Sequence, residues 1–334
     1  MKSTFCLETT KICPLCEGVA TLTYVAMKGY IEETRFDIFE CKDCLVSFAD
    51  PLYSDENVYK YIYEQVEIAY GYERYFRFSR LVKQVDNPLA MLCAAESGYW
   101  AVREALQQYF YNKDIKILEI GSGLGYLTYS LNKEGYCTVG VDISNEAISR
   151  SCKLYGDYYE AGDIFVISGN RKKQYDCVIM TELIEHVVNP IKFIECALSM
   201  LKDGGKLIIT TPNKSNNVVG TIWATDAPCV HLWWFSEKSI AGIAAKLGRK
   251  CEFVDFTKFT KRFYESRDIT TMDQIQSNLP RLTKDGKVTE TSIDRSIKSR
   301  FLSIKMRYVL SYIRRRLKQK ITSKRSCEMC AVLS

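Results

Sequence analysis

Short apolar runs, separated by longer helical patterns, dominate the middle of the chain. The runs are rich in β-branched residues and occupy positions 116–120, 137–143, 175–180 and 205–211. Runs of this kind are typical of buried strands. Because helical stretches lie between them, the sequence predicts an α/β fold with a doubly wound, Rossmann-like sheet over residues 115–260.

The residues before this region follow two other patterns. Residues 1–52 contain the alternating stretches TLTYVAM and TRFDIFE, which predict two strands. Residues 53–114 are predicted to be helical. They hold seven tyrosines: Tyr53, Tyr59, Tyr61, Tyr63, Tyr70, Tyr72 and Tyr75. Core packing and the wall of a binding site explain such tyrosines equally well.

The segment 261–334 is predicted to be a linker followed by a helix over 295–320. One apolar stripe, with spacings of three and four residues, consists of Ile297, Phe301, Ile304, Tyr308 and Tyr312. Basic side chains occupy the other faces: Arg300, Lys305, Arg307, Arg314, Arg315 and Lys318. Three interpretations remain open. The helix binds an anionic membrane surface near a lipid-linked acceptor, contacts the phosphates of RNA, or packs on the parent domain.

Composition is that of an ordinary globular protein. The chain has 334 residues, of which 47% are hydrophobic and 26% charged, which leaves room for two domains. No run approaches ~20 apolar residues, which excludes a transmembrane helix, and the first residues lack the apolar segment of a secretory signal. We therefore predict a cytoplasmic protein that the basic tail could hold at the inner membrane surface.

The net charge of +6 is unevenly distributed. Residues 261–334 carry +11, whereas residues 1–260 carry −5. Between Arg295 and Cys327 there are twelve Lys or Arg residues and no acidic one. The excess positive charge therefore lies in the C-terminal segment. It indicates what that segment binds and says nothing of the chemistry of the central domain.

Two C-x-x-C pairs near the N-terminus predict a metal site. The pairs are Cys13 with Cys16 and Cys41 with Cys44, and 24 residues separate them. Four thiolates complete a tetrahedral zinc site. A module of some fifty residues buries too little core to fold without such help. The sequence thus predicts a structural zinc ribbon. A third pair, Cys327 and Cys330, has no matching partner pair and is assigned to the tail.

A glycine loop follows the first strand of the central domain. Gly121, Gly123 and Gly125 lie between that strand and a helical stretch, where backbone can approach a ligand closely. Asp142 ends the next strand, where a carboxylate can hold two ribose hydroxyls. Tyr126 replaces the last glycine of the dinucleotide fingerprint, which disfavours a nicotinamide cofactor.

The segments ILEIGSGLGYLT, VGVDIS, AGDIF, YDCVIMTELIEHVVNP, LKDGGKLIITTPN and HLWWFSEKSIAGIAAKLG occur in this order over residues 116–256. The region resembles a class I S-adenosylmethionine-dependent methyltransferase. The ribbon before it, with CPLC and CKDCLVSFADP, is similar to a bacterial arrangement found in small-molecule and sugar methyltransferases. The resemblance implies a seven-stranded sheet and a helical cover of the cofactor site at 53–114.

The resemblance also implies roles for individual residues. The methionine portion of the cofactor would contact Glu119, Gly121 and Gly123. Its nucleoside would contact Asp142 through the ribose, and Ile143, Asp163 and Ile164 through the adenine. Thr181 and Glu182 follow the fourth strand and would face both cofactor and acceptor.

Both histidines of the chain lie in the segments expected at the catalytic face. Glu182, Glu185 and His186 have the spacing of one helical face, and His231 follows the next strand. His186, His231 and Glu182 are thus candidate catalytic residues. The four side chains together are also a candidate divalent-metal set. This pattern resembles both the ubiquinone-pathway O-methyltransferases and the small-RNA 2′-O-methyltransferases.

The aromatic residues around His231 allow two interpretations. Trp223, Trp233, Trp234 and Phe235 could form a wall against which an acceptor ring stacks, or they could be core residues. Core packing is favoured for Trp234.

The leading hypothesis is S-adenosylmethionine-dependent methylation, at oxygen, of a small molecule or sugar in glycan or specialised metabolite synthesis. One alternative is an RNA 2′-O-methyltransferase that uses ribbon and tail to bind phosphate. The other is a non-catalytic scaffold that binds the cofactor.

Overall fold

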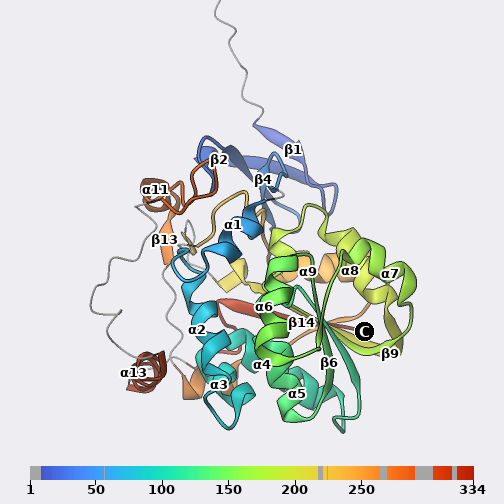
Figure 1. Ribbon diagram of the computed structural model, residues 1–334. Coiled ribbons are helices and arrows are strands. Elements are labelled where there is room, and N and C mark those ends of the chain that lie inside the picture. The colour runs from blue at the N-terminus through green and yellow to red at the C-terminus, as the bar shows by residue number, and fades with distance from the viewer. Residues whose placement is uncertain are drawn as a thin grey trace, which may run out of the picture.

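A seven-stranded sheet forms the centre of the computed structural model (Figure 1). Its strand order is β12-β14-β9-β8-β5-β6-β7. The strands are β5 (Lys116–Ile120), β6 (Cys137–Asp142), β7 (Tyr159–Ala161), β8 (Tyr175–Thr181), β9 (Leu201–Pro212), β12 (Cys251–Phe253) and β14 (Glu328–Leu333). Neighbouring strands are parallel except at β14, which runs antiparallel to both β9 and β12. The predicted doubly wound α/β sheet is confirmed.

The structure describes residues 9–55, 57–216, 221–223, 225–263, 269–289, 304–317 and 322–334. Within these ranges, no helix combines the length and apolar character that crossing a membrane requires.

Alternation along the central strands divides the core into two halves. Ile117, Cys177 and Ile208 belong to one buried cluster. Their strand neighbours Leu118, Val178 and Leu207 belong to the other. Successive side chains on a strand point to opposite faces, so the apolar runs read in the sequence bury both faces of the sheet.

Helices cover both faces of this sheet. Before β5 lie α1 (Val58–Glu64), α2 (Glu73–Leu81), α3 (Pro88–Ala95) and α4 (Ser97–Tyr109). Between the strands lie α5 (Tyr126–Glu134), α6 (Asn145–Tyr155), α7 (Ile164–Asn170), α8 (Pro190–Ser199) and α9 (Glu237–Lys246), with the single turns η1 (Ile184–His186) and η2 (Lys214–Asn216). Later segments are α10 (Thr257–Arg262), α11 (Met272–Ser277) and α13 (Ile304–Leu317).

Local signals set several of these helix starts. Asn189 caps α8, where its side chain accepts a hydrogen bond from the Lys192 backbone, and Pro190 occupies the first turn. Ser236 begins α9 with a reciprocal capping box to Ser239. The α8 cap directly follows residues that line the site described below, and the α9 cap lies five residues after His231, which also lines it.

The N-terminal ribbon does not stand alone. Strands β1 (Thr10–Ile12), β2 (Val19–Lys28), β3 (Arg35–Cys41) and β4 (Ser47–Asp50) form an antiparallel sheet, seen at the top of Figure 1. The fifth strand of this sheet, β11 (Trp233–Trp234), comes from the central domain. The Ala49 backbone N–H also donates to the Leu232 carbonyl over 2.9 Å. The ribbon therefore holds the chain immediately after His231.

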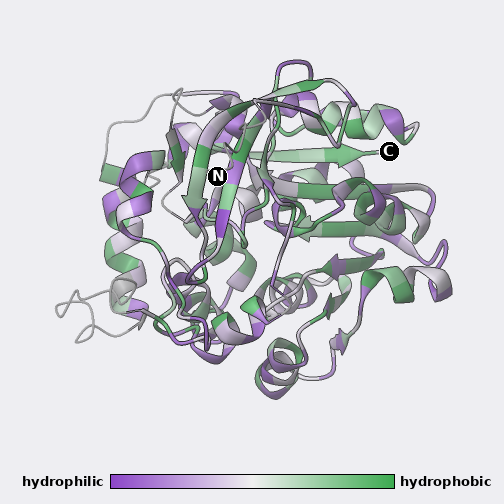
Figure 2. Ribbon diagram, turned by 90° about the horizontal axis from the view of Figure 1, so that it is seen from above, coloured by the Kyte–Doolittle hydropathy of each residue, from purple (hydrophilic) through white to green (hydrophobic). Residues whose placement is uncertain are grey.

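The C-terminal segment differs from its prediction as linker and tail. β14 lies between β9 and β12, and Cys330 at its centre is fully buried, so the last strand belongs to the central sheet. Figure 2 shows this strand as largely hydrophobic up to the C-terminus. Its apolar residues are few and lie beyond a long polar stretch, so the sequence pattern did not reveal it. A small pair, β10 (Thr221–Trp223) and β13 (Ile269–Thr271), also ties this segment to the domain.

The predicted helix over 295–320 is described over α13 only. Ile297, Arg300 and Phe301 lie outside the described residues, as do the side chains of Ile304, Arg307, Arg315 and Lys318. Tyr308 and Tyr312 of the predicted stripe are half-buried and pack against the core of the body.

Candidate functional site

A cavity of about 490 Å³ opens at the carboxyl ends of β5, β6 and β8. This volume and this position at the sheet edge are typical of small-molecule sites in α/β folds. The cavity is lined by each of the predicted cofactor residues: Glu119, Gly121, Gly123, Asp142, Ile143, Asp163, Ile164 and Thr181. The predicted catalytic residues Glu182, His186 and His231 line it as well.

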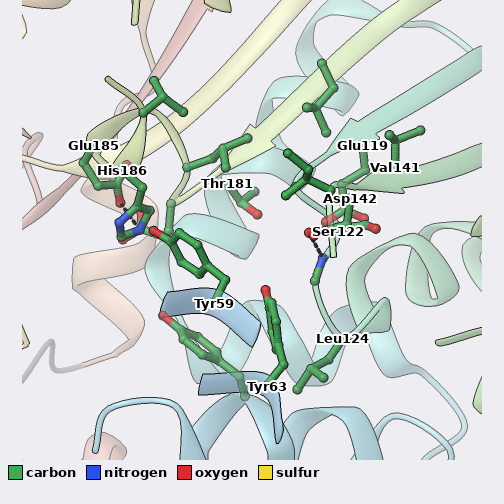
Figure 3. A pocket seen from close by; sticks show the side chains of 18 of the residues that line it. Tyr59, Tyr63, Glu119, Ser122, Leu124, Val141, Asp142, Thr181, Glu185 and His186 are labelled. Atoms are coloured by element: carbon green, nitrogen blue, oxygen red, sulfur yellow. Dashed lines mark hydrogen bonds and ion pairs between the residues drawn. The ribbon is translucent and has the colours of Figure 1, made fainter. Parts of the chain in front are cut away.

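The cavity has two chemically different ends. Figure 3 shows Glu119 and Asp142 on one side and Glu185 and His186 on the other, with Thr181 between them. We call the first side the nucleoside end and the second the histidine end.

Asp142 organises the nucleoside end. Its Oδ2 accepts a hydrogen bond from the Gly123 N–H, and its Oδ1 accepts one from the Ser144 N–H, each over 2.8 Å. The side chain is buried, and burial raises its pKa. Each carboxylate oxygen keeps one further lone pair, so a pair of vicinal hydroxyls fits here.

The glycine loop requires glycine where it meets this carboxylate. Gly123 has φ +49°, and a Cβ there would lie 2.9 Å from the Tyr63 hydroxyl. Ser122, next to it, has a buried Oγ without a hydrogen-bond partner among the described residues. A close backbone cradle and an unpaired hydroxyl fit the polar groups of an S-adenosylmethionine molecule.

Glu119 lies at the floor of the nucleoside end. It is 2% exposed and accepts a hydrogen bond from the Thr128 hydroxyl. Burial raises its pKa to about 8, and nearby Asp142 adds to the rise. A cation beside Glu119 would favour the ionised carboxylate. The positively charged amino group of a ligand could supply that cation.

The remaining predicted cofactor residues surround the nucleoside end. Asp163 caps α7, where its Oδ1 accepts a hydrogen bond from the Phe165 N–H over 2.9 Å. Ile143 is 68% exposed even though it lines the cavity, whereas Ile164 is buried. An exposed apolar side chain beside a polar floor suits one face of a flat ring.

At the histidine end, the two imidazoles lie edge to face, with ring centroids 4.5 Å apart. His186 Nδ1 donates to the Val230 carbonyl over 2.8 Å. Burial lowers the pKa of His186 to about 4 and that of His231 well below its usual value. Both rings are therefore neutral near pH 7.

A buried acidic side chain lies beside each imidazole. Glu185 Oε1 lies 3.6 Å from His186 Nε2, and Asp226 Oδ1 lies 3.4 Å from His231 Nδ1. Thr211 donates a hydrogen bond to Glu185, whose pKa burial raises to about 8. Asp226 is fully buried and was not identified from the sequence. Its only signal there is an acidic residue in the turn five positions before His231.

The predicted helical face of Glu182, Glu185 and His186 is wrong. Glu182 has φ +48°, and its backbone N–H donates to the Thr210 carbonyl, which extends the edge of β8. Only the single turn η1 follows it. The backbone at Glu182, directly after the last residue of β8, is thus left-handed and does not begin a helix.

The predicted divalent-metal set is not supported. Among the described residues, the donor atoms of Glu182, Glu185, His186 and His231 do not gather within 4.8 Å of one another. The turn at Glu182 and the carbonyl contacts of His186 explain why the set does not converge.

Aromatic residues from the helical segment close the cavity. Tyr59, Tyr63, Tyr72 and Tyr75 line it, and Tyr59 packs edge to face against His186 at 6.0 Å. The Tyr59 hydroxyl is buried without a hydrogen-bond partner among the described residues. Arg74 also lines the cavity and was missed in the sequence among the tyrosines.

Of the three tryptophans in the predicted acceptor wall, one lines the cavity and two do not. Trp223 lines the cavity. Trp233 is a core residue stacked on Phe235 at 6.0 Å, and its Nε1 donates to the Val187 carbonyl over 2.8 Å. Trp234 is buried outside the cavity lining, as the core interpretation expects.

The two C-x-x-C pairs converge in the ribbon. The sulfur atoms of Cys13, Cys16, Cys41 and Cys44 all lie within 4.8 Å of one another. Cys13 and Cys44 sulfurs are 3.7 Å apart, and those of Cys16 and Cys41 are 3.4 Å apart. Zinc–sulfur bonds of about 2.3 Å in a tetrahedron place sulfurs at similar separations. The four side chains therefore form a zinc-capable group.

Part of the chain is similar to known methyltransferases. Residues 98–252 match a family described as a methyltransferase domain. The human mitochondrial ubiquinone biosynthesis O-methyltransferase is 33% identical over 109 residues, covering 30% of this chain and 30% of that protein. The corresponding protein of Coxiella burnetii (strain Dugway 5J108-111) is 29% identical over 149 residues, covering 43% and 63%. The chain thus spans between about a third and under two thirds of the length of these relatives.

Solved structures are more distantly similar. A methyltransferase described as SAM-dependent, from Archaeoglobus fulgidus, is 16% identical, with a TM-score of 0.40 and coverage of 70% of this chain and 92% of that one. The family match, by contrast, spans β5 to β12, the stretch that supplies the glycine loop, Asp142 and both histidines. Residues 98–252 thus match a methyltransferase domain, and this match includes segments that line the cavity.

Proposed function

We propose that the protein transfers a methyl group from S-adenosylmethionine to an oxygen atom of a small hydroxylated molecule or sugar. One observation carries this proposal. A single cavity has a ribose-compatible carboxylate at one end and a neutral histidine backed by a carboxylate at the other. The partial similarity to proteins named as ubiquinone biosynthesis O-methyltransferases supports oxygen as the acceptor atom.

At the nucleoside end, the residues bind and orient the cofactor. Asp142 would accept hydrogen bonds from the ribose hydroxyls, Asp163 would accept one from the adenine amino group, and Ile143 and Ile164 would pack on the adenine. Glu119 and the backbone at Gly121 and Gly123 would hold the amino-acid end. Bound S-adenosylmethionine supplies an activated methyl group, so the protein mainly has to position donor and acceptor.

This arrangement predicts that cofactor binding releases a proton. Free Glu119, with a pKa of about 8, is mostly protonated at pH 7. The ligand ammonium favours the carboxylate, so binding lowers this pKa, and the affinity rises as the pH increases from 6 to 8. We expect the dissociation constant to fall by up to about tenfold per pH unit in that window.

Calorimetry in buffers of different ionisation enthalpy measures the released proton. Glu119→Gln is the matched control, because the ligand's own amino group titrates equally with both proteins. Equal proton release by wild type and Glu119→Gln would contradict the assignment.

At the histidine end, His231 is the proposed base. Its Nδ1 faces Asp226, which leaves Nε2 on the opposite side of the ring for the acceptor hydroxyl. His186 is less available, because its ring contacts the Val230 carbonyl and lies beside Glu185. As the oxygen gains the methyl group, its proton passes to His231 Nε2, and Asp226 stabilises the imidazolium.

Asp226 acts on this step through His231. Replacing Asp226 with Asn keeps the size of the side chain but removes the charge, so we expect kcat to fall by roughly tenfold to 100-fold. The distinguishing readout is the acidic limb of the kcat profile, which should move to lower pH because loss of the charge lowers the pKa of His231, whereas a merely structural role would lower kcat equally at every pH. The dissociation constant of the cofactor should stay unchanged, because Asp226 lies beside His231 and away from the nucleoside end.

The acceptor class is open to direct measurement. The protein is incubated with S-adenosylmethionine carrying a trideuterated methyl group and, in separate reactions, with a small-molecule extract and with total RNA of its own cells. The proposal predicts label in a small hydroxylated molecule, with fragments that place it on oxygen. Label in RNA alone would favour RNA methylation. Cofactor binding without any labelled product, at every extract tested, would favour a non-catalytic scaffold.

A further inference from the structure

The side of α13 that faces away from the body is apolar and exposed. Val309, Leu310, Ile313 and Leu317 are 44%, 51%, 46% and 80% exposed. At 100° of rotation per residue they fall within an arc of about 100°. We call these four residues the outer face. In a surface helix, an apolar arc of this kind normally packs against the core. Because these four side chains face solvent instead, they indicate a binding surface.

The other side of α13 already fixes the helix to the protein. The Tyr308 hydroxyl donates to the Met91 carbonyl over 3.4 Å, and the Tyr312 ring lies 6.1 Å from that of Phe263. α13 packs beside α2, near the lower left of Figure 1. These tyrosine contacts hold the helix, so the outer face is not needed for that purpose.

Cations border the outer face on both edges. Arg314 lies beyond one edge, and Lys305 and Arg316 lie beyond the other, all exposed. Arg316 leans back to donate to the Tyr312 hydroxyl over 3.2 Å. The sequence between Arg295 and Cys327 has no acidic residue to offset them. An apolar arc with Lys and Arg at its margins is the pattern of a helix lying in the plane of an anionic bilayer.

We propose that α13 binds the surface of an anionic lipid bilayer, with the outer face inserted at the acyl boundary and the bordering cations among the headgroups. A phosphate-binding surface would need the cations but not the apolar arc. A protein partner would account for the apolar arc but not for cations on both of its edges.

Helix α2, against which α13 packs, also lines the main cavity. Arg74 of α2 lines both that cavity and a smaller one of about 200 Å³, to which Tyr308 and Tyr312 contribute. A bilayer at the outer face would therefore lie one helix layer from the cover of the main cavity. This inference stands independently of the proposed methyl transfer.

Co-sedimentation of the full chain with vesicles tests the proposal. One set contains phosphatidylcholine and phosphatidylglycerol, and the other phosphatidylcholine alone. Wild type should bind the anionic vesicles at least about tenfold better, and added salt should weaken that binding. Leu310→Glu/Ile313→Glu should lose it by at least about tenfold. Tyr111→Glu/Val166→Glu, two exposed sites elsewhere, should keep it.

Other outcomes would overturn the proposal. These are equal binding of the outer-face variant, absence of binding to anionic vesicles, or RNA binding that survives this variant. A dimer that the outer-face variant dissociates would assign the face to a second copy of the chain. A large drop in the unfolding temperature of that variant would mean that the chain itself covers the face. Hydrogen exchange of wild-type α13, slowed only by anionic vesicles, checks the result without substitution.

Discussion

Replacing Asp142 with alanine is expected to weaken S-adenosylmethionine binding by roughly three orders of magnitude. The carboxylate would accept hydrogen bonds from two ribose hydroxyls, and each charge-assisted bond contributes about 1.5–3 kcal/mol. It also fixes the glycine loop through the Gly123 N–H. Losing both effects removes the binding surface for the nucleoside. Isothermal titration calorimetry measures the change.

Two further variants serve as controls, one for the loss of any carboxylate and one for folding. Asp157→Ala removes an exposed carboxylate outside the cavity and should leave the affinity unchanged. Asp142→Asn keeps an acceptor oxygen for one backbone N–H, so it should fold like wild type while still binding weakly. An Asp142→Ala protein with wild-type affinity would mean that the nucleoside does not bind at this carboxylate.

Replacing Cys13 with serine is expected to unfold the ribbon. Four cysteines would hold one zinc ion, and structural zinc contributes on the order of 10 kcal/mol to folding of small modules. Metal analysis should find about one zinc per wild-type chain. The variant should lose that zinc and unfold the ribbon at a lower temperature. Cys137→Ser, at an exposed cysteine outside the group, is the matched control.

The same substitution should disturb the histidine end of the cavity. β4 pairs with β11, and the Ser236 hydroxyl donates to the Cys44 carbonyl over 2.7 Å. These contacts hold the chain that follows His231. We expect turnover to fall by roughly 100-fold, as for a misplaced catalytic group, with cofactor binding largely kept. Zinc-free wild type that folds and turns over normally would refute a structural metal.

Patterns with local causes were predicted well. The run at 116–120 became β5, and the run at 175–180 became β8 with one added residue. Their apolar residues bury both sheet faces, which is what an unbroken apolar run signals. Asp142 and the glycine loop were found because a strand, a turn and a helix set their geometry within about 25 residues.

Features with long-range causes were not predictable. β14 belongs to the seven-stranded sheet only because it pairs with β9 and β12, and its six residues alone do not indicate those partners. The spacing of Glu182 and His186 implies a helix, but the pairing of β8 with β9 extends to Thr181 and leaves a left-handed turn after it. Asp226 gains significance only from its position 3.4 Å from His231.

Titration of the purified full chain with S-adenosylhomocysteine, the product of methyl donation, tests the central claim most directly. We expect one site per chain, competition with S-adenosylmethionine, and loss of binding in Asp142→Ala but not in Asp157→Ala. Absence of binding to wild-type protein that is folded and carries zinc would contradict it.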